Sequence, residues 1–581
     1  MKADLTRITF EPSKHFSRVI MQQGRVQLDA DWNEQAAILS HYLQALTADV
    51  IGPQGGPEAD LGFGIKAYPS APLSPVSNDF QVAAFALNGV RQQGLGTYYI
   101  DGIRCEVDST PVTVKVQSVS STPPGTATVQ ADQWTLDGTP FQLNQFVELF
   151  DDVQLPNIRP QFSPRAVQIT GVQIADAQRP GLTLTLQGVP SNLNSASAPK
   201  LRRLITYLSQ PDYPVPDGEK LNATTGPTYL VYLDLWERHI TYFEDDSIRE
   251  VALGGPDTAT RAKVVWQVKA VPGTLPSGSE GRDQCDEFKP SDPNFWAGLF
   301  GANRGRLKAK AKKNDASMDP RIVPPDARYR GVENHLYRVE IHRRGSPWDG
   351  KDGTKISAAT FKWSRENGAV VFPIAKLFSG SSTTTVILKN LGRDDRFGLA
   401  EGDWVEIHDD DYVLQNRAAN LLQVQSIDRT GLTVILKDVP GSSVGQDASR
   451  HPLLRRWDQQ AGAPAEGGLT VGSDSAALVQ EGVWLELENG VQIQFQTLSD
   501  QNGSPLSQYR TSDYWLIPAR TAIGDLEWPT EADLQGNPVP IAKPPDGVTH
   551  HYAPLGVITL AARGSVTLAA DCRKSFPFYA K

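Results

Sequence analysis

One segment of this chain occurs twice, and the repetition limits the folds that the sequence can adopt. The stretch FVELFDDVQLPN begins at Phe146, and the similar stretch WVEIHDDDYVLQN begins at Trp404. Glu148 in the first copy corresponds to Glu406 in the second, and a run of aspartates follows in both. Each stretch has the residue types of a partly buried strand, followed by residues that favour a turn. The pattern indicates a duplicated structural unit.

The similarity continues downstream of these two stretches. RPGLTLTL begins at Arg179, and RTGLTVIL begins at Arg429. Both copies therefore consist of a strand, an acidic turn, a strand, a glycine turn and a further strand. We predict two small β modules of common design. A weaker match, EGVWLELENGVQIQF from Glu481, would be a partial third copy, although chance similarity between β-rich segments is the alternative.

The composition supports a mainly β fold. The chain has 581 residues, including 49 glycines and 42 prolines, which favours many short strands joined by turns. We predict an N-terminal extended arm and one long helix, followed by several small β-barrel or β-sandwich modules. The predicted domains are an arm and helix for docking or oligomerisation (1–57), a β domain with the first repeat copy (58–225), a central β body (226–390), a β module with the second copy (391–460) and a C-terminal β domain (461–581).

The stretch DADWNE near the N-terminus resembles the start of a calcium-binding loop. Asp29, Asp31 and Asn33 occupy the first, third and fifth positions of such a loop. The sixth position should be glycine and is Glu34, and the twelfth should be a bidentate glutamate and is Ser40. We therefore predict no metal at this stretch. We predict no cofactor for the chain.

The same stretch is better explained as the start of a helix that follows the arm at residues 1–24 and ends near Val50. Asp31, with Glu34 three residues later, resembles a capping box. Apolar residues then recur at alternating spacings of four and three, which is the pattern of a coiled-coil seam: Trp32, Ala36, Leu39, Leu43, Leu46 and Val50. Ile38 and Tyr42 widen the apolar face. The pattern fits association with a partner helix, and it also fits a helix docked on its own domain.

No catalytic motif was found in the sequence, and we predict that the protein is not an enzyme. The aspartate pairs at 151–152 and 409–411 are typical of turns in which Asp caps its own backbone, with a cation site as the alternative. The run RGRLKAKAKK at 304–313 would, as a strand, present Lys308, Lys310 and Lys312 on one face. That face would suit an acidic partner, or it would protect an edge strand from aggregation.

The net charge, the hydropathy and the cysteine content of the chain indicate which partners it can have and in which compartment it is made. The net charge of −10 argues against a nucleic-acid partner, and we expect no membrane span because no apolar run reaches about 18 residues. Three widely spaced cysteines, Cys105, Cys285 and Cys572, disfavour a disulfide framework. We expect the chain to be made and assembled in the cytoplasm. That expectation leaves open whether it acts in the cytoplasm, at a membrane or outside the cell.

Several stretches resemble a family known mainly from gene clusters of phage tail-like contractile injection systems. The first stretch is also similar to a pattern in phage tail and baseplate proteins, in which an arm, a Gly-Arg turn (Gly24, Arg25) and a helix with Asn-Glu (Asn33, Glu34) precede β modules. The matching stretches are HFSRVIMQQGRVQLDADWNEQ, IREVALGGPDTATRAKVVWQV, VENHLYRVEIH, TFKWSRENGAVVFPI, SDYWLIPARTAIGDLEWP and HHYAPLGVITL.

This resemblance implies a structural accessory of a contractile particle, at the baseplate or its periphery, without catalytic residues. The implied partners are copies of the chain itself, in multiples of three or six, and other particle proteins such as baseplate or sheath components. The alternative function is a surface-recognition module that binds a glycan or an envelope component. The residues predicted to dock or oligomerise are Gly24, Arg25, Trp32, Asn33, Glu34, Leu39, Leu43, Leu46 and Val50.

Overall fold

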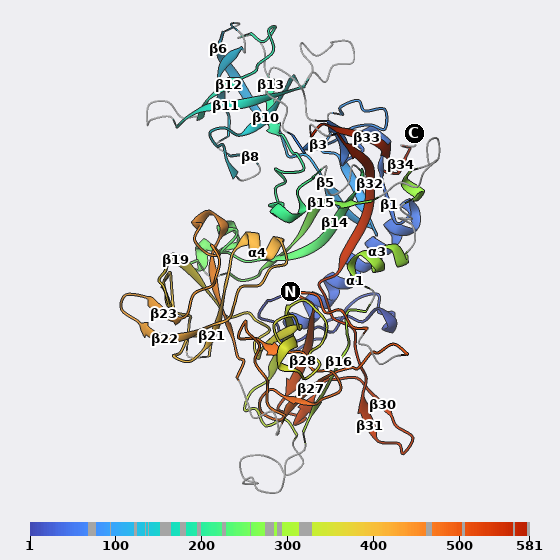
Figure 1. Ribbon diagram of the computed structural model, residues 1–581, viewed down its shortest axis with the longest axis vertical. Helices are drawn as coiled ribbons and strands as arrows, with labels where there is room; N and C mark the ends of the chain where they lie inside the picture. Colours follow the sequence, from blue (N-terminus) through green and yellow to red (C-terminus); the bar gives the residue numbers. More distant parts are fainter. Residues whose placement is uncertain are drawn as a thin grey trace. The chain divides into compact units, whose positions relative to one another are not determined.

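The structure is a computed structural model, and its arrangement of helices and strands is drawn in Figure 1. It describes residues 1–67, 77–92, 94–120, 122, 125–133, 135–136, 139–151, 164–174, 182–194, 199–222, 228–255, 257–273, 284–287, 293–301, 303–312, 328–394, 396–460, 467–501, 506–561 and 564–577.

The chain forms two compact units, each built from several chain segments. Their boundaries fall within two helices, α1 (Asp29–Ile51) and α3 (Pro293–Phe300), and within three strands, β14 (Thr228–Ile240), β15 (Arg261–Pro272) and β32 (His550–Leu560). Unit 1 comprises Met1–His41, Trp236–Val265 and Trp296–His550, and unit 2 comprises Tyr42–Leu235, Trp266–Phe295 and His551–Lys581.

The fold is mainly β, as predicted, with one long helix near the N-terminus. The short helices among the described residues are α2 (Gln284–Glu287), α3 (Pro293–Phe300) and α4 (Asp410–Leu414). Among those residues, no helix combines the length and the apolar character needed to cross a bilayer.

The first repeat copy belongs to a closed antiparallel barrel in unit 2, drawn in cyan to green in Figure 1. Its ring order is β10-β11-β12-β7-β6-β13. The strands are β6 (Val112–Ser120), β7 (Thr126–Ala131), β10 (Phe146–Asp151), β11 (Arg165–Ile174), β12 (Leu182–Gln187) and β13 (Pro199–Arg203). Asp152 and the turn at 179–181, which belong to the predicted repeat, lie outside the described residues.

The second copy belongs to a closed barrel in unit 1, with the ring order β19-β20-β23-β22-β21-β24. It includes two strands that precede the boundary expected at residue 391. The strands are β19 (Val371–Ser379), β20 (Thr383–Leu388), β21 (Trp404–His408), β22 (Leu422–Asp428), β23 (Thr433–Lys437) and β24 (Leu453–Trp457).

The two barrels have the same topology, which confirms the duplicated design. When the strands of each barrel are numbered in chain order, the third strand pairs with the fourth and sixth, and the second with the first and fifth. The first and fourth strands of each barrel carry a bulge: between Val116 and Ser118 in β6, Ile169 and Gly171 in β11, Ile374 and Lys376 in β19, and Val424 and Ser426 in β22. Bulges sharpen the bend that lets a sheet close on itself.

The repeat extends to the last strand of each barrel. Glu148 in β10 lies opposite Arg202 in β13, and Glu406 in β21 lies opposite Arg455 in β24, in the same cross-strand register. The flanking residues point into the barrel cores, so both glutamates lie on the outer faces of their barrels. Both are nevertheless buried.

The weaker third match is not a third barrel. Its strands β26 (Leu485–Glu486) and β27 (Val491–Phe495) form a three-stranded sheet with β16 (Leu307–Ala311). β16 is the basic run, and it forms the predicted strand: Leu307, Ala309 and Ala311 are buried, and the lysines alternate with them. Lys313 lies outside the described residues.

The centre of unit 1 is a five-stranded sheet with the order β25-β18-β17-β28-β29. The strands are β17 (His335–Arg343), β18 (Thr360–Ser364), β25 (Ala477–Leu478), β28 (Tyr514–Arg520) and β29 (Asp525–Leu526). One face shares a hydrophobic core with the three-stranded sheet and buries Trp363 and Trp515 there. Trp236 and Trp266 are also buried, so these four tryptophans belong to the core, as their sequence context indicated.

The remaining strands form smaller sheets. In unit 2, the sheet β34-β1-β4-β5 contains β1 (Gln54–Pro57), β4 (Thr97–Ile100), β5 (Ile103–Glu106) and β34 (Ser575–Phe576). Strands β14, β15, β32 and β33 (Val566–Asp571) form a four-stranded sheet with the order β15-β14-β32-β33. The two-stranded sheets are β2 (Gly64–Ala67) with β3 (Phe80–Ala83), β8 (Thr135–Leu136) with β9 (Thr139–Pro140), and β30 (Thr530–Ala532) with β31 (Pro538–Pro540).

The expectation of no disulfide was wrong. Cys285 in α2 is bonded to Cys572, which follows β33, with 5.6 Å between their Cα atoms. The pair is separated by 287 residues, and a spacing argument cannot identify partners so far apart in sequence. Cys105 is buried and free.

We expect Glu148→Ala to destabilise the first barrel by about 3–5 kcal/mol, because removing one partner of a buried ion pair leaves the other charge desolvated. Urea unfolding followed by tryptophan fluorescence and circular dichroism measures this change. Asp132→Ala is the matched control, since that aspartate is exposed. If Glu148→Ala and Asp132→Ala are equally stable, the buried ion pair of Glu148 does not contribute to stability as proposed.

Candidate functional site

The predicted docking residues lie on the N-terminal arm and α1, and the arm folds back along the helix. The Thr6 backbone N–H and hydroxyl donate to the Asp29 carboxylate at 3.0 and 2.6 Å, and the Thr9 hydroxyl donates to Glu34 at 2.5 Å. After a short turn the chain returns, and the Val19 N–H donates to the side chain of Gln35 at 2.8 Å. The arm is therefore held by polar side chains of the helix.

The helix begins three residues earlier than the capping-box prediction placed it, because Leu28 and not Asp31 precedes the first helical residue. It starts at Asp29, so Asp31 lies at the third helical position and is not the cap itself. The Asp31 carboxylate accepts a 3.4 Å hydrogen bond from the Leu28 N–H, which is the contact that the third residue of a capping box makes. Glu34 binds the arm and does not cap the helix.

The predicted seam is exposed along α1. Its large side chains are between 55% and 79% exposed: Trp32, Leu39, Leu43, Leu46 and Val50. Ala36 and Tyr42, beside them, are exposed as well. Large apolar groups gathered on one exposed helical face are typical of interaction surfaces.

A different face of α1 packs against the chain itself. Ala30 and Ile38 are buried, and Ile38 is fully so. At about 100° per residue, the seam lies roughly 80–160° around the helix axis from Ile38. The helix therefore has one face for its own subunit and another that its own subunit leaves uncovered.

The other predicted residues lie beside this helix. Gly24 has a left-handed φ of 70° in the turn before α1, and a Cβ there would meet nothing within 4 Å, so its backbone conformation is the reason for glycine. Arg25 and Asn33 are exposed, and Glu34 is half-buried against the arm. The exposed large apolar side chains of the arm are Ile8, Phe16, Ile20 and Met21, and those between the arm and α1 are Val26 and Leu28.

The structure also shows a buried ionic cluster within unit 1 that sequence reasoning missed. The polar face of the five-stranded sheet meets the outer face of the second barrel, where Lys362 donates to Glu406. Glu340, on the neighbouring strand, is 2.8 Å from the Lys2 ammonium and accepts from Arg338 at 2.6 Å. The alternation of charged with apolar residues in YRVEIH and WVEIH was the available signal.

Burial and charge set the protonation of this cluster. Burial by itself would raise the pKa of Glu406, but His408 and Lys362 hold that pKa well below its usual value. Burial lowers the pKa of Lys2 to about 7 despite the attraction of Glu340. Burial likewise lowers the pKa of His342 and of His408 to about 4, so both imidazoles are neutral near pH 7.

The aspartate run of the second copy caps a helix. Asp409 precedes α4, and its carboxylate accepts from the Tyr412 N–H at 3.0 Å and from the Gly445 N–H at 2.9 Å. Asp410 is paired with Arg238 and, at 2.7 Å, with His451. Across the described ranges, no three His, Cys, Asp or Glu side chains are grouped so that they could hold a metal ion.

A family model matches residues 1–144, 204–275 and 301–573, which is more than half of the chain. The chain belongs to a family of unknown function, DUF6519. The family match includes the arm, α1, the central sheet and the second barrel, while strands β10 to β13 of the first barrel lie outside it. No curated protein and no solved structure matches the chain.

We expect stability to fall as the pH drops from about 6.5 to about 4. His342 and His408 have a lower pKa in the folded chain, so the unfolded chain binds more protons in this window. His342→Gln or His408→Gln should therefore reduce the slope of unfolding free energy against pH, measured by urea titrations at several pH values.

His451 provides a control of opposite sign. Its hydrogen bond to Asp410 raises its pKa, so it contributes stability that is present below pH 6.5 and lost as the pH rises through the folded pKa. His451→Gln should lower stability below pH 6.5 without changing the slope there, and it should remove the loss of stability that follows as the pH rises above 6.5. If all three variants and the unmodified protein show the same dependence of unfolding free energy on pH over the whole range, these histidines do not control the pH dependence of stability.

Proposed function

We propose that this protein is a structural component of a phage tail-like contractile injection particle, located at the baseplate or on a peripheral scaffold. Copies of the chain associate through the exposed seam of α1. The observation that carries the proposal is a heptad of large apolar side chains that the subunit itself leaves uncovered. The resemblance of several segments to proteins of such particles supports the assignment to this class of assembly.

The seam favours a second copy of α1 as its occupant. Residues spaced by four and three along a helix fit between the side chains of another helix. The positions that flank the seam carry one charge, Asp49, and are otherwise uncharged: Asn33, Gln35, Ser40, Tyr42 and Thr47. Identical helices can therefore meet with little repulsion between like charges. Each large apolar side chain buried in this way contributes about 1.5–3 kcal/mol.

The rest of unit 1 supports a scaffold role. The arm is held along α1 by the Thr6–Asp29, Thr9–Glu34 and Val19–Gln35 hydrogen bonds, so the helix presents its seam from a fixed base. The second barrel is attached to the central sheet through the buried Lys362–Glu406 pair. Contractile particles are symmetric, so we expect copies in multiples of three or six.

We expect the double variant Leu39→Asp plus Leu43→Asp to reduce the assembly to a monomer, because four or more carboxylates would have to be buried at each shared interface. Size-exclusion chromatography with light scattering measures the mass. The matched control is Val251→Asp plus Leu253→Asp, which changes two exposed apolar residues away from the helix and should leave the mass unchanged.

A monomeric unmodified protein would contradict self-association through α1. Retention of the oligomer by the Leu39→Asp plus Leu43→Asp variant would contradict it equally. A loss of mass in both variants would show that the effect is not specific to the seam.

Membership of a particle is tested separately. We expect an epitope-tagged chain to co-purify with intact contractile particles and to be visible on them by immunogold electron microscopy. The seam variant should be absent from the particles, while the Val251→Asp plus Leu253→Asp control should remain. Absence of the unmodified tagged chain from purified particles would contradict the particle role while leaving self-association intact.

A further inference from the structure

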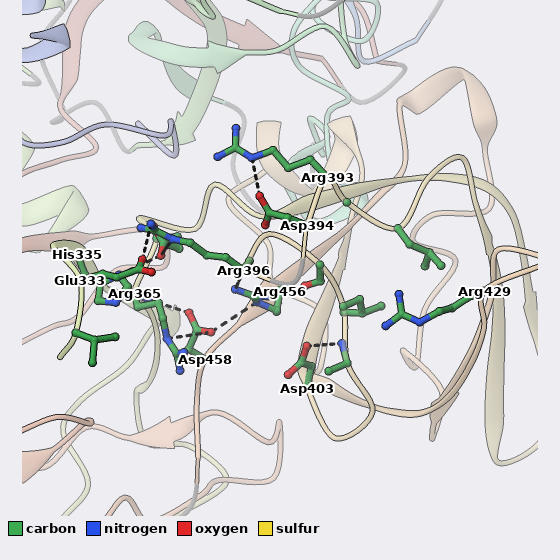
Figure 2. Close-up of a pocket in the computed structure, with 17 residues that line it drawn as sticks. Glu333, His335, Arg365, Arg393, Asp394, Arg396, Asp403, Arg429, Arg456 and Asp458 are labelled. Carbon is green, nitrogen blue, oxygen red and sulfur yellow. Dashed lines mark hydrogen bonds and ion pairs between the residues drawn. The ribbon is translucent and has the colours of Figure 1, made fainter.

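A pocket of about 680 Å³ lies in unit 1, at the edge of the second barrel (Figure 2). Its walls come from the β20–β21 connection, the turn after β18, the end of β24 and the β22–β23 hairpin. The volume is in the range of pockets that bind small molecules. Five arginines line it: Arg365, Arg393, Arg396, Arg429 and Arg456.

The loop that carries two of these arginines is held in place by the barrel. Arg456 donates to the carbonyl oxygens of Arg396, at 2.9 Å, and Gly398, at 2.5 Å. The Phe397 N–H donates to Asp394 at 2.8 Å, and the Arg393 guanidinium lies 3.9 Å from the centre of the Phe397 ring. The wall of the pocket is therefore ordered by contacts of the protein itself.

Five acids also line the pocket, so its net charge does not identify a ligand: Glu333, Glu366, Asp394, Asp403 and Asp458. Their oxygens are occupied by donors of the protein. Glu366 accepts from Arg396 at 2.8 and 3.0 Å, Asp458 accepts from the Arg365 N–H at 2.8 Å, and Asp403 accepts from the Ala400 N–H at 2.8 Å. The acids therefore have little remaining capacity to accept hydrogen bonds.

Some N–H donors of the arginines that line the pocket have no carboxylate partner. Within the described part of the chain, no carboxylate pairs with Arg429, and its guanidinium points toward the middle of the lining residues in Figure 2. Arg393 is 3.5 Å from Asp394 and 3.6 Å from Asp4, which are long distances for hydrogen bonds. The Arg365 Nε atom is buried without a hydrogen-bond partner among the described residues. Arg393 and Arg429 are exposed, so solvent satisfies their donors, and the acceptor oxygens of a ligand can replace that solvent.

We propose that this pocket binds a small polar molecule through an oxyanion group: a phosphate, a sulfate or a carboxylate. Planar guanidinium groups match the geometry of these anions and bind them through paired hydrogen bonds. In Figure 2 the Arg393 guanidinium points away from Arg429, so Arg429 is the arginine that binds the oxyanion. Arg456 positions the loop without contacting the ligand. The pocket volume leaves room for a further part of the size of a sugar ring. The inference does not depend on the role of α1.

The test is isothermal titration calorimetry of the full chain with inorganic phosphate, sulfate and citrate at constant ionic strength, with chloride as the reference. We expect saturable binding of at least one of these probes. Arg429→Ala and Arg429→Gln should each weaken it about tenfold, which corresponds to about 1.4 kcal/mol. Arg344→Ala is the matched control, because Arg344 is an exposed arginine of the same unit that does not line the pocket, and it should leave the affinity unchanged.

Three outcomes would overturn the proposal. They are no saturable binding of any probe by the unmodified protein, unchanged affinity in both pocket variants, and an equal loss in Arg344→Ala. Circular dichroism melts of each variant exclude loss of folding as the cause of weaker binding. Among the three probes, preference for citrate would assign a carboxylate ligand, and preference for phosphate or sulfate a phosphorylated or sulfated one.

Discussion

Each barrel has a glutamate on its outer face that is buried by the rest of its unit, and the attachment of the barrel depends on satisfying that carboxylate. Removing a carboxylate from water costs several kcal/mol unless cations and hydrogen bonds replace the solvent. In unit 2, Arg91 and Arg202 surround Glu148. In unit 1, Lys362 and His408 surround Glu406. The same residue in the same strand register is thus used twice, with two arginines beside it in unit 2 and a lysine and a histidine beside it in unit 1.

The shared topology places this carboxylate at the same position in both barrels. The glutamate lies on the third strand of each barrel, and an arginine lies opposite it on the sixth. In the first barrel the two form an ion pair, whereas in the second Arg455 donates to the Gly368 carbonyl oxygen. A change in strand order or a one-residue shift would move the carboxylate away from its cations or into the apolar core. The residues around each glutamate can differ between the barrels as long as they include a positively charged side chain.

The two faces of α1 differ, because one is buried within the chain and the other is exposed. Ile38 and the polar contacts to Thr6, Thr9 and Val19 attach the helix and the arm to each other and to unit 1. The heptad seam is left for an exterior contact. The pocket at the edge of the second barrel is built by different means, from arginines that also order a loop. The proposed assembly surface and the proposed ligand pocket therefore lie on separate segments of the chain.

Periodicity in the sequence was sufficient for the strand-rich class, for the duplicated module, for the long helix and for the seam, because each depends on residues close together in the chain. The tertiary structure decided four other features. These are the exposure of Leu39 and Leu43, the burial of Glu148 and Glu406, the Cys285–Cys572 bond, and the guanidinium of Arg429 without a carboxylate partner. Each of these depends on which distant segment covers a residue or leaves it bare. A repeat pattern specifies the face on which a side chain lies, but the segment opposite that face comes from elsewhere in the chain.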